Sequence, residues 1–178
     1  MVNLILASIA IIIFVAYNII LICMYGVPQS LSHTFYYLKE DGKWPWWFTV
    51  MMWTVCILLL ISWIPINNGI SEWSSYLTFL PAITCISLMF SSLAGNARDN
   101  ETTKMVHLVC ARISAVTAIL WICICCWKIM YVIPIWIGII LLIAWLTKTW
   151  KFGRDYWIEW LAFGPVFTAI IIEAILQL

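Results

Sequence analysis

One arginine lies inside a long apolar stretch of the sequence, where a charge is unfavourable. Arg112 comes seven residues after Met105, where the stretch begins, and would lie about 10 Å deep in a helix that rises ~1.5 Å per residue. A guanidinium in hydrocarbon is paired with a carboxylate or binds an anion. We therefore expect either a structural ion pair with Glu159 or a bidentate contact with a lipid phosphate or another anionic substrate.

His107 lies in the same apolar stretch and shares a helical face with three small residues. The spacing i, i+4, i+7, i+11 places His107, Ala111, Ser114 and Ala118 on one side of a helix. Small residues let a neighbouring helix approach closely. This face predicts a packing seam, which could also join two copies of the chain in a homo-oligomer. Alternatively, His107 faces a cavity and acts in catalysis or ligand binding.

Most other groups able to bind an anion or exchange protons follow the first and third apolar stretches or begin the last. They are Ser30, Ser32, His33, Asn96, Arg98, Asp99, Glu101, Arg154, Asp155 and Glu159. Because polar groups near a membrane span tend to mark function, we expect a ligand site at this side of the protein. Its expected binding residues are Arg112, Asn96, His107, Ser30, Ser32, Glu159 and Arg154.

Catalysis and metal binding are further hypotheses for these residues. His33, His107 and Asp99 could gather around a metal ion, and Ser32 with a histidine could form a hydrolase pair. Both arrangements require the first and third loops to meet. The two histidines lack the HxxxH or HExxH spacing of metal sites, so no metal or other cofactor is expected.

The composition indicates which kind of structure must position these residues. Of 178 residues, 65% are hydrophobic and 10% are charged, whereas soluble domains are about half apolar and a quarter charged. A net charge of +1 excludes nucleic-acid binding driven by overall charge. We therefore predict an all-α protein that forms one transmembrane domain, with membrane lipids as its partners.

A span needs about 20 apolar residues to cross the bilayer, and six segments qualify. They cover about residues 2–24, 46–66, 73–93, 105–127, 129–146 and 156–176. Only Lys128 separates the fourth and fifth spans, so the chain must turn sharply there. Between the first two spans, Leu31, Phe35 and Leu38 recur at helical spacing. This pattern predicts a short helix at the membrane interface, begun by Ser30 or Ser32 and ended by Gly42.

The basic residues predict the orientation of the chain. Seven of them lie in the loops after the first, third and fifth spans, namely Lys39, Lys43, Arg98, Lys104, Lys148, Lys151 and Arg154. The other side has only Lys128. Since cytoplasmic loops are rich in Lys and Arg, these loops should be cytoplasmic. Both termini should then lie outside a plasma membrane.

Short motifs in the first two-thirds of the chain resemble the DRAM-like six-helix membrane proteins. They are Pro28-Gln29-Ser30-Leu31-Ser32 after the first span, Gly95-Asn96 after the third, and His107 with Ala111 in the fourth. Ser30, Ser32, Phe35 and Tyr36 also resemble a pattern of uncharacterised bacterial membrane proteins. The resemblance implies a six-helix fold and a connection with lipids. The family pattern tends to have an acidic residue where this chain has His33, so the resemblance supplies no catalytic residue.

The function expected from these observations is binding of a lipid or another anionic amphiphile at the cytoplasmic face. One alternative is an intramembrane lipid-modifying enzyme that uses His107 with His33 or Asp99. Another is a small transporter, although the middles of the second, third and fifth spans are apolar. The last is an assembly subunit.

Overall fold

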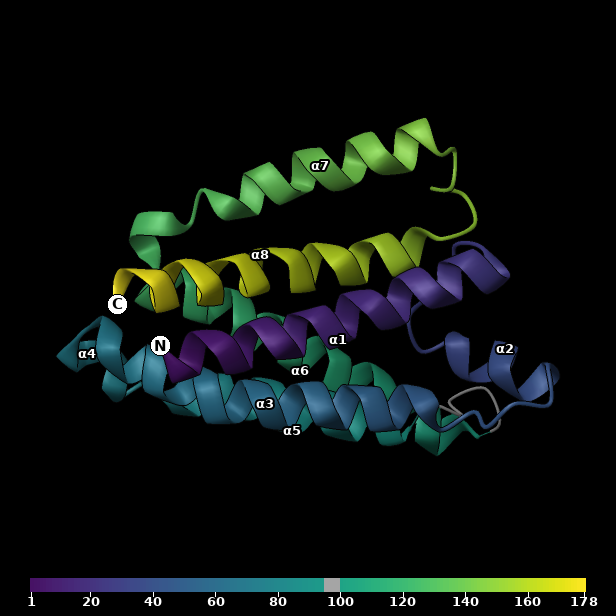
Figure 1. The fold of residues 1–178 in the computed structure, drawn as a ribbon. Coiled ribbons are helices and arrows are strands. Elements are labelled where there is room, and N and C mark those ends of the chain that lie inside the picture. Colours follow the sequence, from purple (N-terminus) through teal and green to yellow (C-terminus); the bar gives the residue numbers. More distant parts are fainter. Residues whose placement is uncertain (95–99) are drawn as a thin grey trace.

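The computed structural model describes residues 1–94 and 100–178, and it contains helices but no strand in these ranges (Figure 1). Six helical segments are long and apolar enough to cross a membrane. They are α1 (Val2–Tyr25), α3 (Trp47–Ile70), α4 with α5 (Glu72–Ser75 and Phe79–Leu93), α6 (Glu101–Cys125), η1 with α7 (Trp127–Ile129 and Val132–Leu146) and α8 (Arg154–Leu176). The predicted all-α class with six spans is confirmed, and the sharp turn at Lys128 is the 3₁₀ helix η1.

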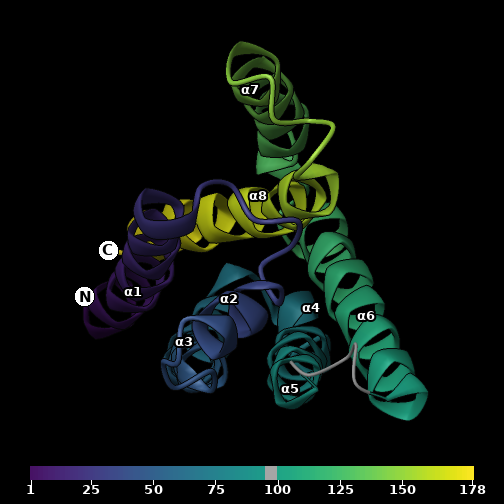
Figure 2. The same ribbon diagram turned by 90° about the vertical axis from the view of Figure 1, so that its right-hand side faces the viewer.

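Helix α7 stands outside the other spanning helices and packs on α8 (Figure 2). Helix α1 packs on α3, α3 on α5, and α5 on α6, while α8 contacts α1, α3 and α6. Many large apolar side chains on the outer faces are exposed. Such a surface would aggregate in water, whereas lipid solvates it, so the fold is that of a membrane protein.

The predicted short helix after α1 is α2 (Thr34–Glu40), and it lies at one end of the bundle (Figure 1). Leu31, Phe35 and Leu38 are all buried, and the Phe35 ring lies 5.1 Å from the Trp46 ring. The apolar stripe therefore packs against the protein itself. Gly42 follows the helix with φ 67°, a left-handed conformation that glycine adopts without strain. The helix begins at Thr34, and its N-cap residue is His33, which makes no side-chain capping hydrogen bond, in place of the predicted Ser30 or Ser32.

A polar cluster fastens the far end of α2 to the end of α1. The Tyr25 hydroxyl donates to Asp41 Oδ2 at 2.7 Å, and Lys43 Nζ lies 2.5 Å from the same oxygen. These hydrogen bonds, from Lys43 first and then Tyr25, hold the pKa of Asp41 below its ordinary value. The cluster is exposed at the bundle end, where water lowers the strength of such pairs, so it orients α2 more than it stabilises the fold.

Buried hydrogen bonds tie the helices together at the opposite end of the bundle. Asn67 is fully buried; its amide nitrogen donates to Ser74 O at 2.6 Å and its oxygen accepts from Trp121 Nε1 at 2.9 Å. Gln177 Nε2 donates to Ile66 O at 2.7 Å. Segments α3, α4, α6 and the end of α8 are thereby joined. Because Asn67 is satisfied in this way, α3 continues to Ile70, beyond the predicted end of the second span at Ile66.

Candidate functional site

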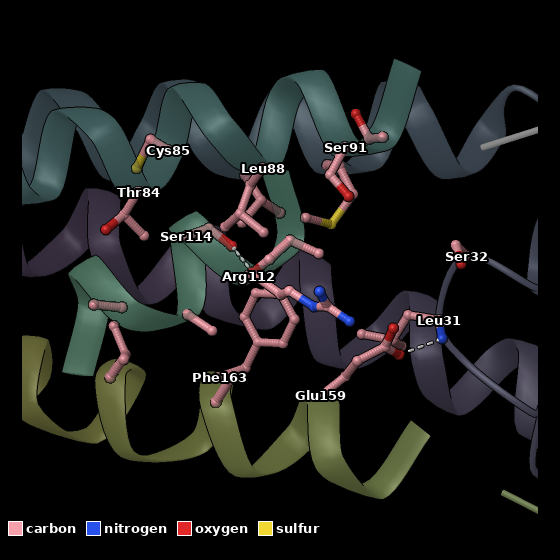
Figure 3. Close-up of a pocket in the computed structure, with 18 of the residues that line it drawn as sticks. Leu31, Ser32, Thr84, Cys85, Leu88, Ser91, Arg112, Ser114, Glu159 and Phe163 are labelled. Carbon is pink, nitrogen blue, oxygen red and sulfur yellow. Dashed lines mark hydrogen bonds between the residues drawn. The ribbon is translucent and has the colours of Figure 1, made fainter. Parts of the chain in front are cut away.

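A cavity of about 250 Å³ lies among the spanning helices. Residues of α3, α5, α6 and α8 line it, together with Leu31 and Ser32 from the segment before α2 (Figure 3). The volume exceeds the ~150 Å³ of an apolar cavity that binds benzene. It lies just below the lower limit of ~300 Å³ for typical ligand pockets. The space can therefore hold a small apolar group or part of a larger molecule.

The cavity is polar toward the α2 end of the bundle and mainly apolar beyond it. The polar side chains at the α2 end are Ser32, Ser91, Ser92, His107, Arg112 and Glu159. Farther along the same helices most lining groups are apolar, such as Leu59, Trp63, Ala118, Val166 and Phe167. The hydroxyls of Thr84 and Ser114, which also line this part, donate to backbone carbonyls of their own helices. A molecule that fits this space has a polar head and an apolar tail.

Arg112 lies at the opening of the cavity. It lines the cavity and is also exposed on the outer surface. Arg112 comes eleven residues after α6 begins at Glu101, so it lies about 16 Å from that end of the helix along its axis. Figure 3 shows the guanidinium extending toward Glu159. Among the described residues no acceptor or carboxylate pairs with it, so the predicted ion pair with Glu159 is not formed.

Glu159 is occupied by the backbone of the chain segment before α2. Its Oε2 accepts a hydrogen bond of 2.6 Å from the Leu31 backbone N–H (Figure 3). Close by, the Tyr156 backbone N–H donates to Gln29 O at 2.9 Å. These two bonds fix the segment between α1 and α2 to the first turns of α8.

His107 joins two helices. Its Nδ1 donates to the Ser91 carbonyl at 2.9 Å, and the Ser91 hydroxyl lies 3.2 Å from the same nitrogen. The last carbonyls of a helix have no partner within the helix, and Ser91 lies in the last turn of α5. The Thr49 hydroxyl likewise donates a hydrogen bond of 2.8 Å to the Ser92 carbonyl. His107 therefore has a structural role at the cavity wall, with Nε2 left as its acceptor in the neutral ring.

The predicted small-residue face is turned into the molecule. His107, Ala111, Ser114 and Ala118 all line the cavity, and Ser114 and Ala118 are buried. Within one chain, the small side chains leave the space in which the cavity lies. The face is thus a cavity wall in this structure, and its use in joining two copies of the chain stays a prediction.

Several predicted site residues do not line the cavity. The His33 ring packs against Tyr37 at 4.7 Å, and Ser30 Oγ lies 3.1 Å from Ser32 Oγ. Arg154 is exposed, with Nε 3.3 Å from the carboxylate of its neighbour Asp155. The predictions for Asn96 and Asp99 fall outside the described residues. Among the described residues, no group of three or more His, Cys, Asp or Glu side chains could hold a metal ion.

Trp63 lines the cavity, but the sequence does not predict it as a site residue. Its side chain is almost fully buried and lines the cavity, and its indole N–H has no hydrogen-bond acceptor in the described part of the chain. Tryptophan occurs both at membrane interfaces and in packed cores. No sequence signal distinguished Trp63 from the other twelve tryptophans.

Together these features define an integral membrane protein with six candidate spans and an internal cavity that has a polar and an apolar end. Comparison with protein-family models, curated proteins and solved structures finds no match to this chain. The resemblance to DRAM-like proteins therefore stays a prediction. Any statement of function must be built from the cavity itself.

Proposed function

We propose that the protein binds a lipid or another anionic amphiphile in the cavity. The acidic head group contacts Arg112, and an apolar chain extends toward Trp63. The observation that carries the proposal is a guanidinium that has no partner among the described residues, at the opening of a cavity whose inner wall is mainly apolar. Arginine binds phosphate and carboxylate groups through two parallel hydrogen bonds, so a bound anion would satisfy a charge that the described residues leave unpaired.

The basic end of the bundle supports a site near the cytoplasmic face. Helix ends and connections at the α2 end include Lys39, Lys43, Lys104, Lys148, Lys151 and Arg154, whereas Lys128 lies at the opposite end in η1. Basic residues near spans favour the cytoplasmic side. On this orientation, the polar end of the cavity faces the anionic leaflet of a plasma membrane, which attracts basic segments.

Native mass spectrometry of the purified full chain tests the binding proposal. We expect wild-type protein to retain an acidic lipid and Arg112→Gln to lose it. A charged hydrogen bond contributes about 1.5–3 kcal/mol, which is an affinity change of roughly tenfold or more. Arg112→Lys should retain part of the binding because it keeps the charge.

The matched control is Lys128→Gln, which makes the same change of charge in a residue that does not line the cavity. It should retain lipid as wild type does. Equal lipid retention by wild type and Arg112→Gln, with both proteins folded, would contradict the proposal.

A further inference from the structure

The cavity has an open side between α6 and α8. Three residues line the cavity and are exposed on the outer surface at the same time: Leu108 and Arg112 on α6, and Ile158 on α8. Leu108 is 43% exposed and Ile158 is 50% exposed. Since these side chains border both the cavity and the lipid-facing surface, they form the rim of an opening in the wall of the bundle.

Helices α6 and α8 are joined less firmly than their neighbours. A hydrogen bond of 2.8 Å between Thr84 and Thr117 joins α5 to α6, and Trp136 with Thr168 joins α7 to α8 at 2.9 Å. Among the described residues, the hydrogen bond found between α6 and α8 lies at the end away from α2, where Cys126, the C-cap residue of α6, contacts Glu173 of α8. The two helices diverge toward the α2 end in both views of the fold (Figures 1 and 2).

The segment before α2 covers part of the cavity end that lies nearest α2. The Leu31 side chain is 3% exposed, and its backbone N–H is held by Glu159. The cavity end that it partly covers points toward water. An amphiphile can reach the cavity more directly from the bilayer than from the aqueous side.

We propose that the gap between α6 and α8 is a lateral entrance through which one acyl chain of an acidic bilayer lipid passes into the cavity. The head group stays beside Arg112 at the rim, where the guanidinium is exposed. A cavity of about 250 Å³ is below the size of typical pockets for whole ligands, so a single chain occupies it and a second chain remains in the bilayer. This inference rests on the proposed function and adds the route and the class of ligand.

Photocrosslinking in vesicles tests the entrance. The full chain is reconstituted in phosphatidylcholine vesicles that contain phosphatidic acid with a diazirine at the end of one acyl chain. After illumination, peptide mass spectrometry locates the adducts. We expect adducts on the inner wall, in residues 55–63 of α3 and 163–167 of α8, and no competition by excess water-soluble glycerol phosphate.

Bulky rim variants with matched controls identify the route. Leu108→Trp narrows the opening and should lower the yield of inner-wall adducts several-fold. Leu120→Trp alters a residue of α6 that is equally exposed, at 42%, but does not line the cavity, so its yield should equal that of wild type. On α8, Ile158→Trp is the rim variant and Ile175→Trp is its control, because Ile175 does not line the cavity. This second pair keeps the test decisive if a variant of α6 fails to fold.

The outcomes separate the entrance from the binding proposal. Inner-wall adducts at wild-type yield in folded Leu108→Trp and Ile158→Trp would overturn the lateral route and leave lipid binding intact. Competition by glycerol phosphate would likewise indicate access from water. Adducts confined to lipid-facing residues in wild type, together with no retained lipid in native mass spectrometry, would overturn both proposals.

Discussion

At the scale of single residues, Arg112 and His107 show two uses of a polar side chain in one membrane span. His107 is bound to the end of α5, so its polarity is needed to satisfy a carbonyl. Arg112 lies five positions farther along α6 and has no partner among the described residues. The sequence identified both as unusual, because a charged or polar group in an apolar stretch is easy to recognise.

The sequence could not assign partners to these residues. Glu159 was the expected partner of Arg112 because of its depth in α8, yet the Leu31 backbone occupies it. A backbone N–H is present at every residue except proline and leaves no trace in a sequence pattern. The contact joins positions 31 and 159, which only the assembled fold brings together.

The bond from His107 to α5 predicts a loss of stability in His107→Ala. The variant leaves the Ser91 carbonyl without its donor, and hydrogen bonds between membrane helices contribute about 0.6 kcal/mol on average, with a maximum near 1.7. We expect a lower thermal melting temperature in detergent, with acidic-lipid retention reduced much less than in Arg112→Gln. Thr49→Val, which removes the equivalent donor to Ser92, should have a similar effect. An unchanged melting temperature in His107→Ala would contradict the structural role.

At the scale of elements, apolar length predicted the spans well but not the breaks within them. The predicted third span, residues 73–93, is divided into α4 and α5. Ser71 and Ser74 exchange hydrogen bonds in a capping box at the start of α4. The apolar stripe of α2 was predicted correctly, but its contact surface was expected to be lipid. Periodicity identifies the buried face and cannot say what covers it.

Helix α7 packs on α8 through a close contact at a glycine. A Cβ atom added to Gly164 would lie 2.5 Å from the Trp136 ring, and the Trp136 N–H donates to Thr168 at 2.9 Å. We expect Gly164→Ala to push the two helices apart and to lower stability by about 1–3 kcal/mol, as overpacking does. Thermal unfolding in detergent measures the change.

Gly138→Ala in α7 is the control for this prediction. An added Cβ there meets nothing within 4 Å, so the variant should be neutral or gain up to ~1 kcal/mol from helix propensity. Equal melting temperatures for the Gly164 and Gly138 variants would show that the contact between α7 and α8 does not limit stability.

At the scale of the whole molecule, the basic connections predict how the bundle lies in the membrane. We expect an engineered Lys151→Cys to react with a membrane-impermeant maleimide only after cells are permeabilised, and Lys128→Cys to react in intact cells. The parent protein is labelled in parallel to measure the background reaction of its own cysteines, because exposed Cys23 and Cys123 lie within spans. Labelling of Lys151→Cys in intact cells would reverse the orientation and move the proposed site to the outer face.

The peripheral place of α7 has a consequence for biogenesis. This helix packs chiefly against α8, which the ribosome makes after it, so α7 must remain in the bilayer for a time without its main neighbour. Helices that insert singly before they associate must be stable in lipid alone. Among the six segments, α7 is second only to α1 in hydropathy, and α1 likewise precedes every helix on which it packs. The high hydropathy of these two segments suits them to remain in lipid until the helices on which they pack are made.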